Sequence, residues 1–240
     1  WAIEGALKED HPMTDQISNT ELQPHLQSHS NLMDKVYRNQ RFIYNASRKY
    51  YLLGRDQLIK ELSPPPRGTV LELGAGTGRN LICTANTYDD CELYGVDISQ
   101  EMLKTAGKSI VKAGFENRIH LAKGDATNFN SEKAFGVKEF DRVFISFSLS
   151  MIPEWQMAIA SAYELTRPGG QIHIVDFGEC KQYPKVFQKL LYAWLSIFHV
   201  HPIRNLPGQL KEAANKANCK VTVKPLYGGY SLQAIIQKPR

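Results

Sequence analysis

The sequence predicts an α/β fold in which helices cover both faces of a doubly wound, mostly parallel sheet. Short apolar runs alternate with segments of helical periodicity along much of the chain, as in proteins built from strand–helix–strand units. Glycines cluster directly after the first apolar run, at residues 74–78. The chain is 240 residues long with 42% hydrophobic and 22% charged residues, which is the balance of a chain that buries a core.

The first part of the chain is polar and acidic. We expect residues 1–30 to be an irregular N-terminal segment. Residues 1–12 are expected to be an addition ahead of a natural start at Met13, because Met13-Thr14 reads as the beginning of a protein.

A helical cap is expected at residues 31–62. One helix is predicted to begin at Asn31, an N-cap residue type that precedes apolar residues at helical spacing. A second is predicted from about Arg48 to Leu62, where three consecutive prolines, residues 64–66, cannot continue a helix.

Residues 63–240 are expected to form the main domain. Alternation of apolar runs with helical patterns implies a parallel sheet with helices on both faces, and a glycine pair near the C-terminal end favours an antiparallel edge pair of strands. The predicted strands are 69–73, 92–96, 119–123, 141–146, 171–176, 220–223 and 232–237; the predicted helices are 79–87, 99–113 and 153–165, with a turn at 167–170.

The strongest local signal is the glycine turn after the first strand. Glu72 is followed by Gly74, Gly76 and Gly78, so the backbone can turn tightly and approach a ligand closely at the start of a helix. The spacing differs from that of pyrophosphate-binding turns. A carboxylate at Glu72 would repel a diphosphate and attract an ammonium group, which favours S-adenosylmethionine as the ligand over NAD or ATP.

Two further carboxylates follow the next two predicted strands. Asp97 comes 21 residues after Gly76, a position from which a carboxylate can accept hydrogen bonds from ribose hydroxyls. Asp125 follows the third strand, where it could accept from an adenine amino group. Each residue could equally be a helix cap or turn residue, but ligands in such sheets bind at the carboxyl ends of strands, where all three features fall.

Taken as a set, these motifs resemble those of class I S-adenosylmethionine-dependent methyltransferases. The resemblance covers about residues 60–180 and implies a Rossmann-like fold and S-adenosyl-L-methionine as cofactor, with S-adenosyl-L-homocysteine as product. It rests on the stretches at residues 72–78, 96–97, 124–126, 140–141 and 167–170.

A narrower resemblance extends over the chain from Asn31. Residues 37–44, 48–56, 198–202 and 227–230 resemble those of bacterial betaine-lipid N-methyltransferases. That family trimethylates the amine of diacylglyceryl-homoserine. The resemblance implies a cytoplasmic enzyme working at the membrane face, and its lipid substrate would be the acceptor.

Candidate site residues follow from these patterns. Tyrosine rings can hold a methylated amine by cation–π attraction, and arginine can clamp a carboxylate. No metal site is expected. The candidates for cofactor binding are Tyr51, Glu72, Gly74, Ala75, Gly76, Thr77, Asp97, Ile98, Met102, Asp125, Ala126 and Ser146; those for positioning are Tyr44, Ser146 and Ser148; and those for substrate binding are Tyr37, Arg41, Tyr44, Arg48, His199, His201, Arg204, Tyr227 and Tyr230.

The basic residues are concentrated toward the C-terminal end. The formal net charge is +5, and residues 181–240 carry ten basic residues and one acidic residue. Within them, residues 181–200 place aromatic and aliphatic side chains on one helical stripe with lysines largely opposite. This pattern favours contact with an anionic membrane surface, although packing of the stripe in the core or as a lid is an equal alternative.

Several other functions fit the same motifs. A quinone-precursor C-methyltransferase, a phosphatidylethanolamine N-methyltransferase and a non-catalytic S-adenosylmethionine-binding protein remain open. Nucleic acid is not expected as a partner, because the loop after the fourth strand, residues 146–152, lacks the Asn/Asp-Pro-Pro-aromatic motif of base-amine methyltransferases. Four scattered cysteines without metal-site spacing agree with a cytoplasmic, peripherally membrane-associated protein.

Overall fold

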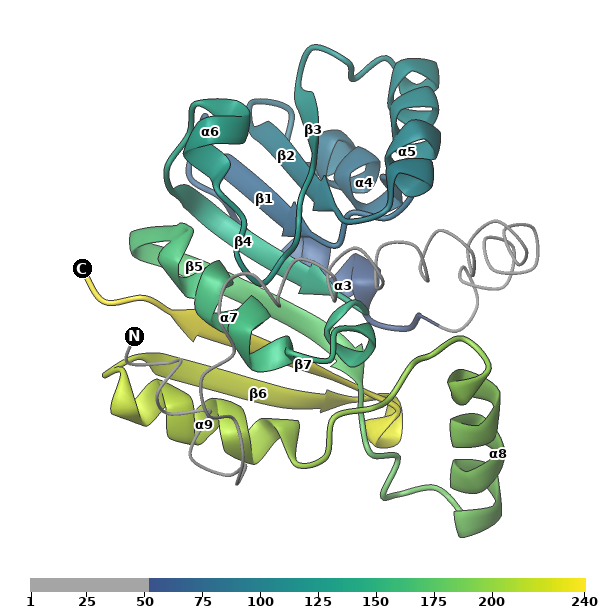
Figure 1. The fold of residues 1–240 in the computed structure, drawn as a ribbon. Coiled ribbons are helices and arrows are strands. Elements are labelled where there is room, and N and C mark those ends of the chain that lie inside the picture. Colours follow the sequence, from purple (N-terminus) through teal and green to yellow (C-terminus); the bar gives the residue numbers. More distant parts are fainter. Residues whose placement is uncertain (1–51) are drawn as a thin grey trace, which may run out of the picture.

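The structure, a computed structural model, describes residues 52–240, and these form one seven-stranded sheet with helices on both faces (Figure 1). The strands lie in the order β3-β2-β1-β4-β5-β7-β6. They are β1 (Thr69–Leu73), β2 (Glu92–Asp97), β3 (Ile119–Lys123), β4 (Phe140–Ser146), β5 (Thr166–Phe177), β6 (Lys220–Leu226) and β7 (Ser231–Gln237). The helices are α3 (Arg55–Glu61), α4 (Arg79–Thr87), α5 (Gln100–Ala113), α6 (Ser131–Phe135), α7 (Trp155–Glu164), α8 (Lys185–Ser196) and α9 (Leu206–Lys216), with short 3₁₀ turns η1 (Leu149–Met151) and η2 (Tyr227–Gly229).

The sheet is parallel except for β7. β1 pairs in parallel with β2 and β4, and β4 with β5, so the carboxyl ends of these strands share one edge. β7 runs antiparallel between β5 and β6. The predicted doubly wound, mostly parallel sheet with an antiparallel C-terminal pair is therefore confirmed.

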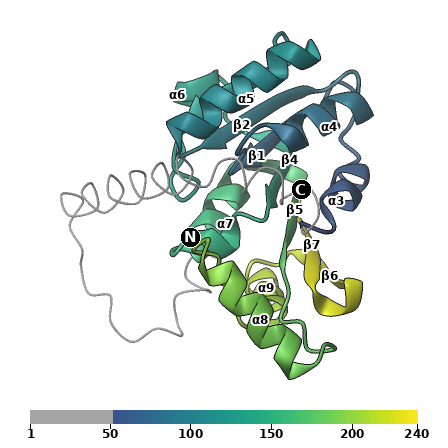
Figure 2. The same cartoon turned by 90° about the vertical axis from the view of Figure 1, so that its right-hand side faces the viewer.

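Two apolar cores lie on opposite faces of the sheet. Figure 2 shows α3 and α7 on the two sides of the sheet. The alternation of side chains along β1 places Leu71 and Leu73 in the core beneath α7 and α9, and Val70 in the core beneath α3, α4 and α5. Helices anchored on both faces hold the carboxyl edge of the parallel strands rigidly, and that edge carries most of the predicted site.

The second helix of the expected cap begins later than predicted. In the described part of the chain, Leu52 to Gly54 are not helical, and α3 starts only at Arg55. Gly54 has φ of +109°, a left-handed conformation that ends the helical path on its N-terminal side. The prediction of an uninterrupted helix through these residues is therefore wrong. It relied on the helical spacing of the apolar residues and gave too little weight to Gly54.

Two other segments differ from the predictions. The expected turn at residues 167–170 is part of β5, which pairs with Phe140 of β4 through Thr166 and with Arg142 through Gln171, across a break in register. Helices α6 and α9 were not predicted. Helix α9 has the usual signals, with buried leucines at 206 and 210 and a proline in its first turn.

Candidate functional site

The glycine turn joins β1 to α4 at the carboxyl edge of the sheet. The backbone N–H groups of Gly74 and Ala75 both donate to the carbonyl of Val96, at 2.8 and 2.9 Å, so the turn is tied to the end of β2. Gly74 has φ of +80°, and a Cβ built there would lie 2.5 Å from Oγ of Ser148. The turn thus requires glycine for its conformation and for its close approach to the loop after β4.

Asp97 braces this turn from the end of β2. Its Oδ2 accepts the backbone N–H of Gly76 at 2.7 Å, and its Oδ1 accepts that of Ser99 at 2.9 Å. Each carboxylate oxygen has two acceptor positions, so one oxygen can accept more than one hydrogen bond. The sequence predicted that Asp97 lies near the glycine turn. The structure shows in addition that the Asp97 carboxylate holds the backbone of the turn in place.

Glu72 lies beneath the turn and is completely buried. Its Oε1 accepts the side-chain N–H of Asn80 in α4 at 2.7 Å. Register pairs Glu72 with Phe144, and alternation along β4 therefore puts Ser146 on the same face of the sheet. The buried Ser146 hydroxyl has no hydrogen-bond partner among the described residues.

The other predicted cofactor residues lie in the segments that follow β1, β2 and β3. Ala75 and Met102 are buried and Thr77 and Ile98 are half-buried, while Ala126 follows β3. Asp125 adopts the turn arrangement that the sequence left open, because its Oδ1 accepts the N–H and hydroxyl of Thr127 at 2.8 and 2.7 Å. Asp125 is half-buried just after the carboxyl end of β3.

The loop after β4 closes over the end of β1. Oγ of Ser148 donates to the carbonyl of Leu73 at 3.1 Å. Phe147 is buried with φ of +54°, an uncommon conformation for a side-chain-bearing residue, and its ring packs edge-on against Phe177 at 4.8 Å. Ser146 is therefore buried on the face of the sheet that carries Glu72, and Ser148 is tied to the end of β1.

The predicted substrate residues divide into exposed and buried ones. His199, His201 and Arg204 are exposed on the connection between α8 and α9, and the backbone N–H of His201 donates to the carbonyl of Ser150 at 2.8 Å. Tyr227 is exposed in η2, whereas Tyr230 is buried against Phe177 and forms part of a core. Tyr37, Arg41, Tyr44, Arg48 and Tyr51 lie outside the described residues.

The amphipathic helix predicted within residues 181–200 is α8, but its apolar stripe is divided. Leu195 and Phe198 are buried, and Phe198 packs edge-on against the half-buried Trp194. Val186 and Leu190 instead expose 70% and 67% of their surface. One part of the stripe therefore packs in the core, as one of the two alternatives expected, and another part is exposed.

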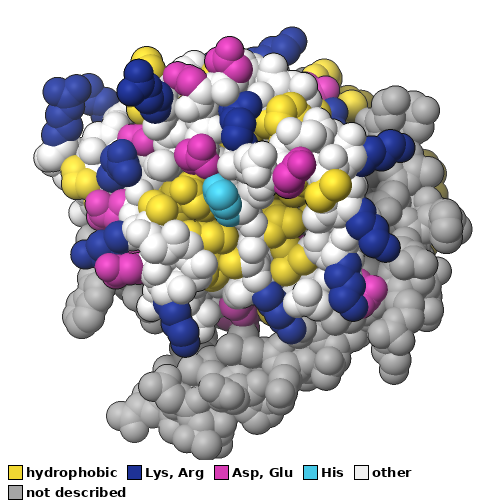
Figure 3. Space-filling model, turned by 90° about the horizontal axis from the view of Figure 1, so that it is seen from above, with side chains coloured by type: hydrophobic (Ala, Val, Ile, Leu, Met, Phe, Trp, Pro, Cys, Tyr) yellow, Lys and Arg dark blue, Asp and Glu magenta, His cyan; other side chains and the backbone are white. Residues whose placement is uncertain are grey.

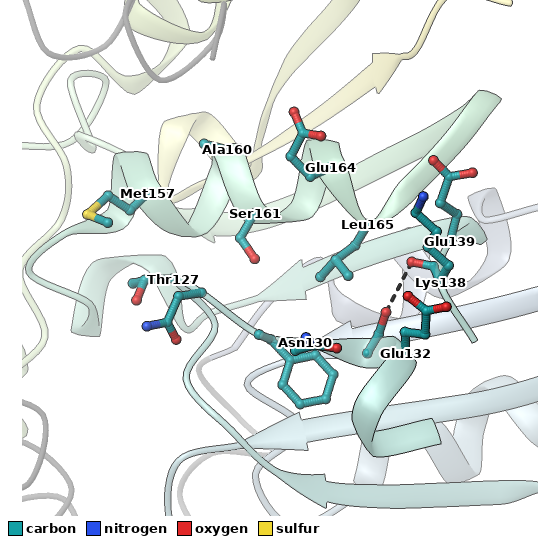
Figure 4. Close-up of a pocket in the computed structure, with 13 residues that line it drawn as sticks. Thr127, Asn130, Glu132, Lys138, Glu139, Met157, Ala160, Ser161, Glu164 and Leu165 are labelled. Carbon is teal, nitrogen blue, oxygen red and sulfur yellow. Dashed lines mark hydrogen bonds between the residues drawn. The ribbon is translucent and has the colours of Figure 1, made fainter. Parts of the chain in front are cut away.

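A groove of about 600 Å³ lies away from the glycine turn, between the segment that follows β3 and α7 (Figure 4). On the side of the groove formed by the segment after β3, Oγ of Ser131 donates to the carbonyl of Lys138 at 3.0 Å. Three carboxylates, Glu132, Glu139 and Glu164, lie among its lining residues. None of the predicted site residues lines this groove.

Sequence reasoning missed two polar residues that support the site. Asn80 holds Glu72, and Asp176 at the end of β5 holds the loop after β4. Asp176 had the same signal as Asp97, a carboxylate directly after an apolar run at the carboxyl end of a strand.

The described residues contain no group of three or more His, Cys, Asp or Glu side chains placed to hold a metal ion. Within the same residues, every helix is too short or too polar to cross a membrane.

Known proteins share both sequence and fold with this chain. Residues 70–170 match the family model described as a methyltransferase domain. The demethylmenaquinone methyltransferase of Bacillus pumilus is 29% identical over 143 residues, which cover 59% of this chain and 59% of the relative. That of Bacillus licheniformis is 26% identical over 222 residues, which cover 82% of this chain and 91% of the relative.

A solved structure shares the fold. Phosphoethanolamine N-methyltransferase 2 of Haemonchus contortus, in complex with phosphomonomethylethanolamine and S-adenosylhomocysteine, superposes with a TM-score of 0.68 at 17% identity over 88% of this chain and 60% of that one. The chain spans about half to three fifths of the length of the first curated relatives it matches. Residues 70–170 are therefore similar in sequence to a methyltransferase domain, and the described residues share the fold of phosphoethanolamine N-methyltransferase 2.

Proposed function

We propose that this protein transfers methyl groups from S-adenosylmethionine to the amine of a lipid head group, and that diacylglyceryl-homoserine is the acceptor and its trimethylated betaine lipid the product. The observation that carries the methyl-transfer part is the pair of carboxylates, Glu72 and Asp97, on either side of a glycine turn at the carboxyl edge of the sheet. The narrower sequence resemblance supports the acceptor.

The described residues fit this cofactor. The space at Gly74, which a Cβ would fill, lets the backbone approach the methionine part of the ligand. Glu72 attracts its ammonium group, Asp97 accepts from its ribose hydroxyls, and Asp125 accepts from its adenine amino group. Ser146 offers a buried hydroxyl that lacks a partner within the described chain.

The reaction itself asks for alignment more than for acid–base strength. The cofactor supplies an activated methyl group on a sulfonium. The amine nitrogen attacks the methyl carbon in line with the carbon–sulfur bond, whose electron pair leaves with sulfur, and the amine loses one proton for each transfer. Ser146 and Ser148 are proposed to hold the acceptor amine in line, and His199, His201 and Arg204 to hold the rest of the head group.

An anionic membrane surface is the proposed partner, through residues 181–200. The exposed apolar side chains of α8 lie beside Lys185 and Lys189, which are also exposed, and α8 carries no acidic residue. On the face around the β3 edge, by contrast, basic and acidic side chains are mixed (Figure 3). Charge of one sign beside exposed apolar groups is the combination that binds anionic lipid surfaces.

Lipid mass spectrometry tests the proposed reaction. Cells that make diacylglyceryl-homoserine and express the wild-type chain are expected to accumulate forms of this lipid heavier by one, two and three methylene units. Asp97→Ala, which removes the brace of the glycine turn, is expected to abolish the increments. A wild-type protein that binds S-adenosylmethionine but leaves this lipid unchanged would contradict the acceptor and keep the cofactor.

C-methylation of a quinone precursor is the second candidate. The demethylmenaquinone methyltransferases among the relatives favour it, above all the one from Bacillus licheniformis, of which 91% is covered. The same lipid extracts decide between the candidates, because a quinone would gain one methylene unit on a ring carbon and the homoserine lipid would gain none.

A further inference from the structure

Asp176 is a buried carboxylate that no part of the proposed methyl transfer uses. It lies next to the end of β5 and is 1% exposed. On its strand it lies on the same face as the apolar side chains of Ile172 and Ile174, which belong to the core beneath α7 and α9. A charged group buried this deeply is costly unless backbone or side-chain donors surround it.

The donors come from the loop after β4. Oδ2 of Asp176 accepts the backbone N–H of Ser150 at 3.1 Å. Oδ1 accepts the N–H of Phe177 at 2.7 Å. Burial raises the pKa of Asp176, and the hydrogen bonds to its carboxylate oppose this effect, so that the resulting pKa is about 6. The group is therefore ionised at neutral pH.

The same loop touches both halves of the site. At one end, Ser148 contacts the β1 carbonyl of Leu73 beside the glycine turn. At the other, the Ser150 carbonyl accepts the N–H of His201, on the connection that carries the proposed head-group residues. Asp176 holds the amide of Ser150 while His201 holds its carbonyl, so one peptide segment joins the two contacts.

We propose that Asp176 is a positioning residue, which fixes the loop after β4 and, through Ser150, sets the place of the His199–Arg204 connection against the cofactor. The inference rests on the proposed function, since it assigns this connection to the acceptor. Asp176 itself does not touch substrate or cofactor. Its carboxylate matters because each of its two oxygens accepts from an amide, whereas an asparagine would turn an N–H₂ group toward one of these donors.

The matched variants are Asp176→Asn and Asp141→Asn. Asp141 lies at the other end of the sheet, where Oδ2 accepts the N–H of Thr69 at 2.8 Å and Oδ1 accepts from Arg167. Each variant removes one charge from a carboxylate that holds backbone amides, but only one of the two lies beside the site. Both proteins are used as full chains.

Hydrogen exchange gives the first measurement and needs no acceptor. Asp176→Asn is expected to speed exchange at least tenfold at the amides of Leu149, Ser150 and His201, while protection in β1 and β2 stays as in the wild type. Asp141→Asn is expected to leave all three amides unchanged. Unchanged exchange at Ser150 and His201 in Asp176→Asn overturns the proposal, whatever the acceptor proves to be.

Kinetics give the second measurement, with vesicles containing diacylglyceryl-homoserine as the probe. Asp176→Asn is expected to bind S-adenosylmethionine within threefold of the wild type, by calorimetry, and to lose at least tenfold in kcat/KM for the lipid. Asp141→Asn is expected to lower Tm without a selective loss of kcat/KM relative to cofactor affinity. If cofactor affinity falls as far as kcat/KM, Asp176 supports the whole fold and the proposal fails. A wild-type protein that is inactive on this lipid would contradict the proposed acceptor. The hydrogen-exchange measurement would still decide the role of Asp176.

Discussion

Among single residues, Gly74 is the one on which the cofactor turn depends most directly. Gly74→Ala is expected to lower the affinity for S-adenosylmethionine at least tenfold and to reduce Tm, because a methyl group there would lie 2.5 Å from Oγ of Ser148 and the residue has φ of +80°. Calorimetric titration and thermal unfolding of the full chain measure the two effects.

Gly107→Ala is the control for this prediction. Gly107 lies within α5, and a Cβ there meets nothing within 4 Å. Alanine is the better helix former, so this variant should gain about 0.5–1 kcal/mol in the free energy of unfolding and bind the cofactor like the wild type. Equal cofactor binding by both alanine variants would rule out the glycine turn as the binding site.

At the scale of elements, α8 offers the sharpest test of membrane contact. Leu190→Glu is expected to reduce flotation with anionic vesicles at least tenfold, because burial of a leucine side chain contributes about 1.5–3 kcal/mol and the new charge opposes the lipid. The variant should keep the wild-type Tm, since Leu190 is 67% exposed. Changes at Trp194 or Phe198 are unsuitable, because these side chains pack inside.

Val111→Glu is the matched control on another helix. Val111 in α5 is 61% exposed and, like Leu190, lies on a helix that also carries lysines. Its flotation should equal that of the wild type. If the two glutamate variants float alike, α8 does not bind the membrane and the proposed partner falls.

The elements that could be predicted from sequence are those whose pattern of apolar residues matches their burial in the fold. The strands at Val70–Leu73 and Val143–Ile145 are buried on both faces, and their apolar runs, broken only by Glu72 in the first, indicate this directly. The start of α3 could not be found from apolar spacing, because Gly54 overrides it. The burial of Tyr230 could not be found either, since it depends on how η2 brings that ring against β5.

At the scale of the whole molecule, two buried groups on β5 set opposite dependences of stability on pH. The pKa of His173 is lowered from 6.5 to about 3 by burial and by Arg142, so its contribution to stability is full above pH 6.5 and is lost as pH falls. The pKa of Asp176 is raised from 3.8 to about 6 by burial, so its contribution is full below pH 3.8 and is lost as pH rises through 6.

Between pH 7 and pH 5 the two effects oppose each other. Linkage gives a loss of about 2 kcal/mol from His173 and a gain of about 1 kcal/mol from Asp176 over this interval. His173→Gln should therefore become more stable on acidification relative to the wild type, and Asp176→Asn less stable. Denaturant unfolding at the two pH values measures this. The same change in the free energy of unfolding between pH 7 and pH 5 in all three proteins would contradict the prediction.

The whole site was only partly accessible to sequence reasoning, for a physical reason. Residues at the carboxyl ends of parallel strands must meet, so Glu72, Asp97 and Asp125 could be placed together from their positions in the chain. The tie between Ser150 and His201 could not, because it depends on the path of the chain after β5, for which no local pattern exists.

The antiparallel strand β7 bears on how the sheet assembles. β6 pairs with the rest of the sheet only through β7, and β7 follows β6 in the chain. When β6 is made, the strand with which it pairs is therefore not yet in place. We expect the two to form a hairpin across η2 and then to dock as a unit, because contacts between near neighbours close sooner than distant ones. The seam between β5 and β7 would then be the last to form in folding and the first to part under load.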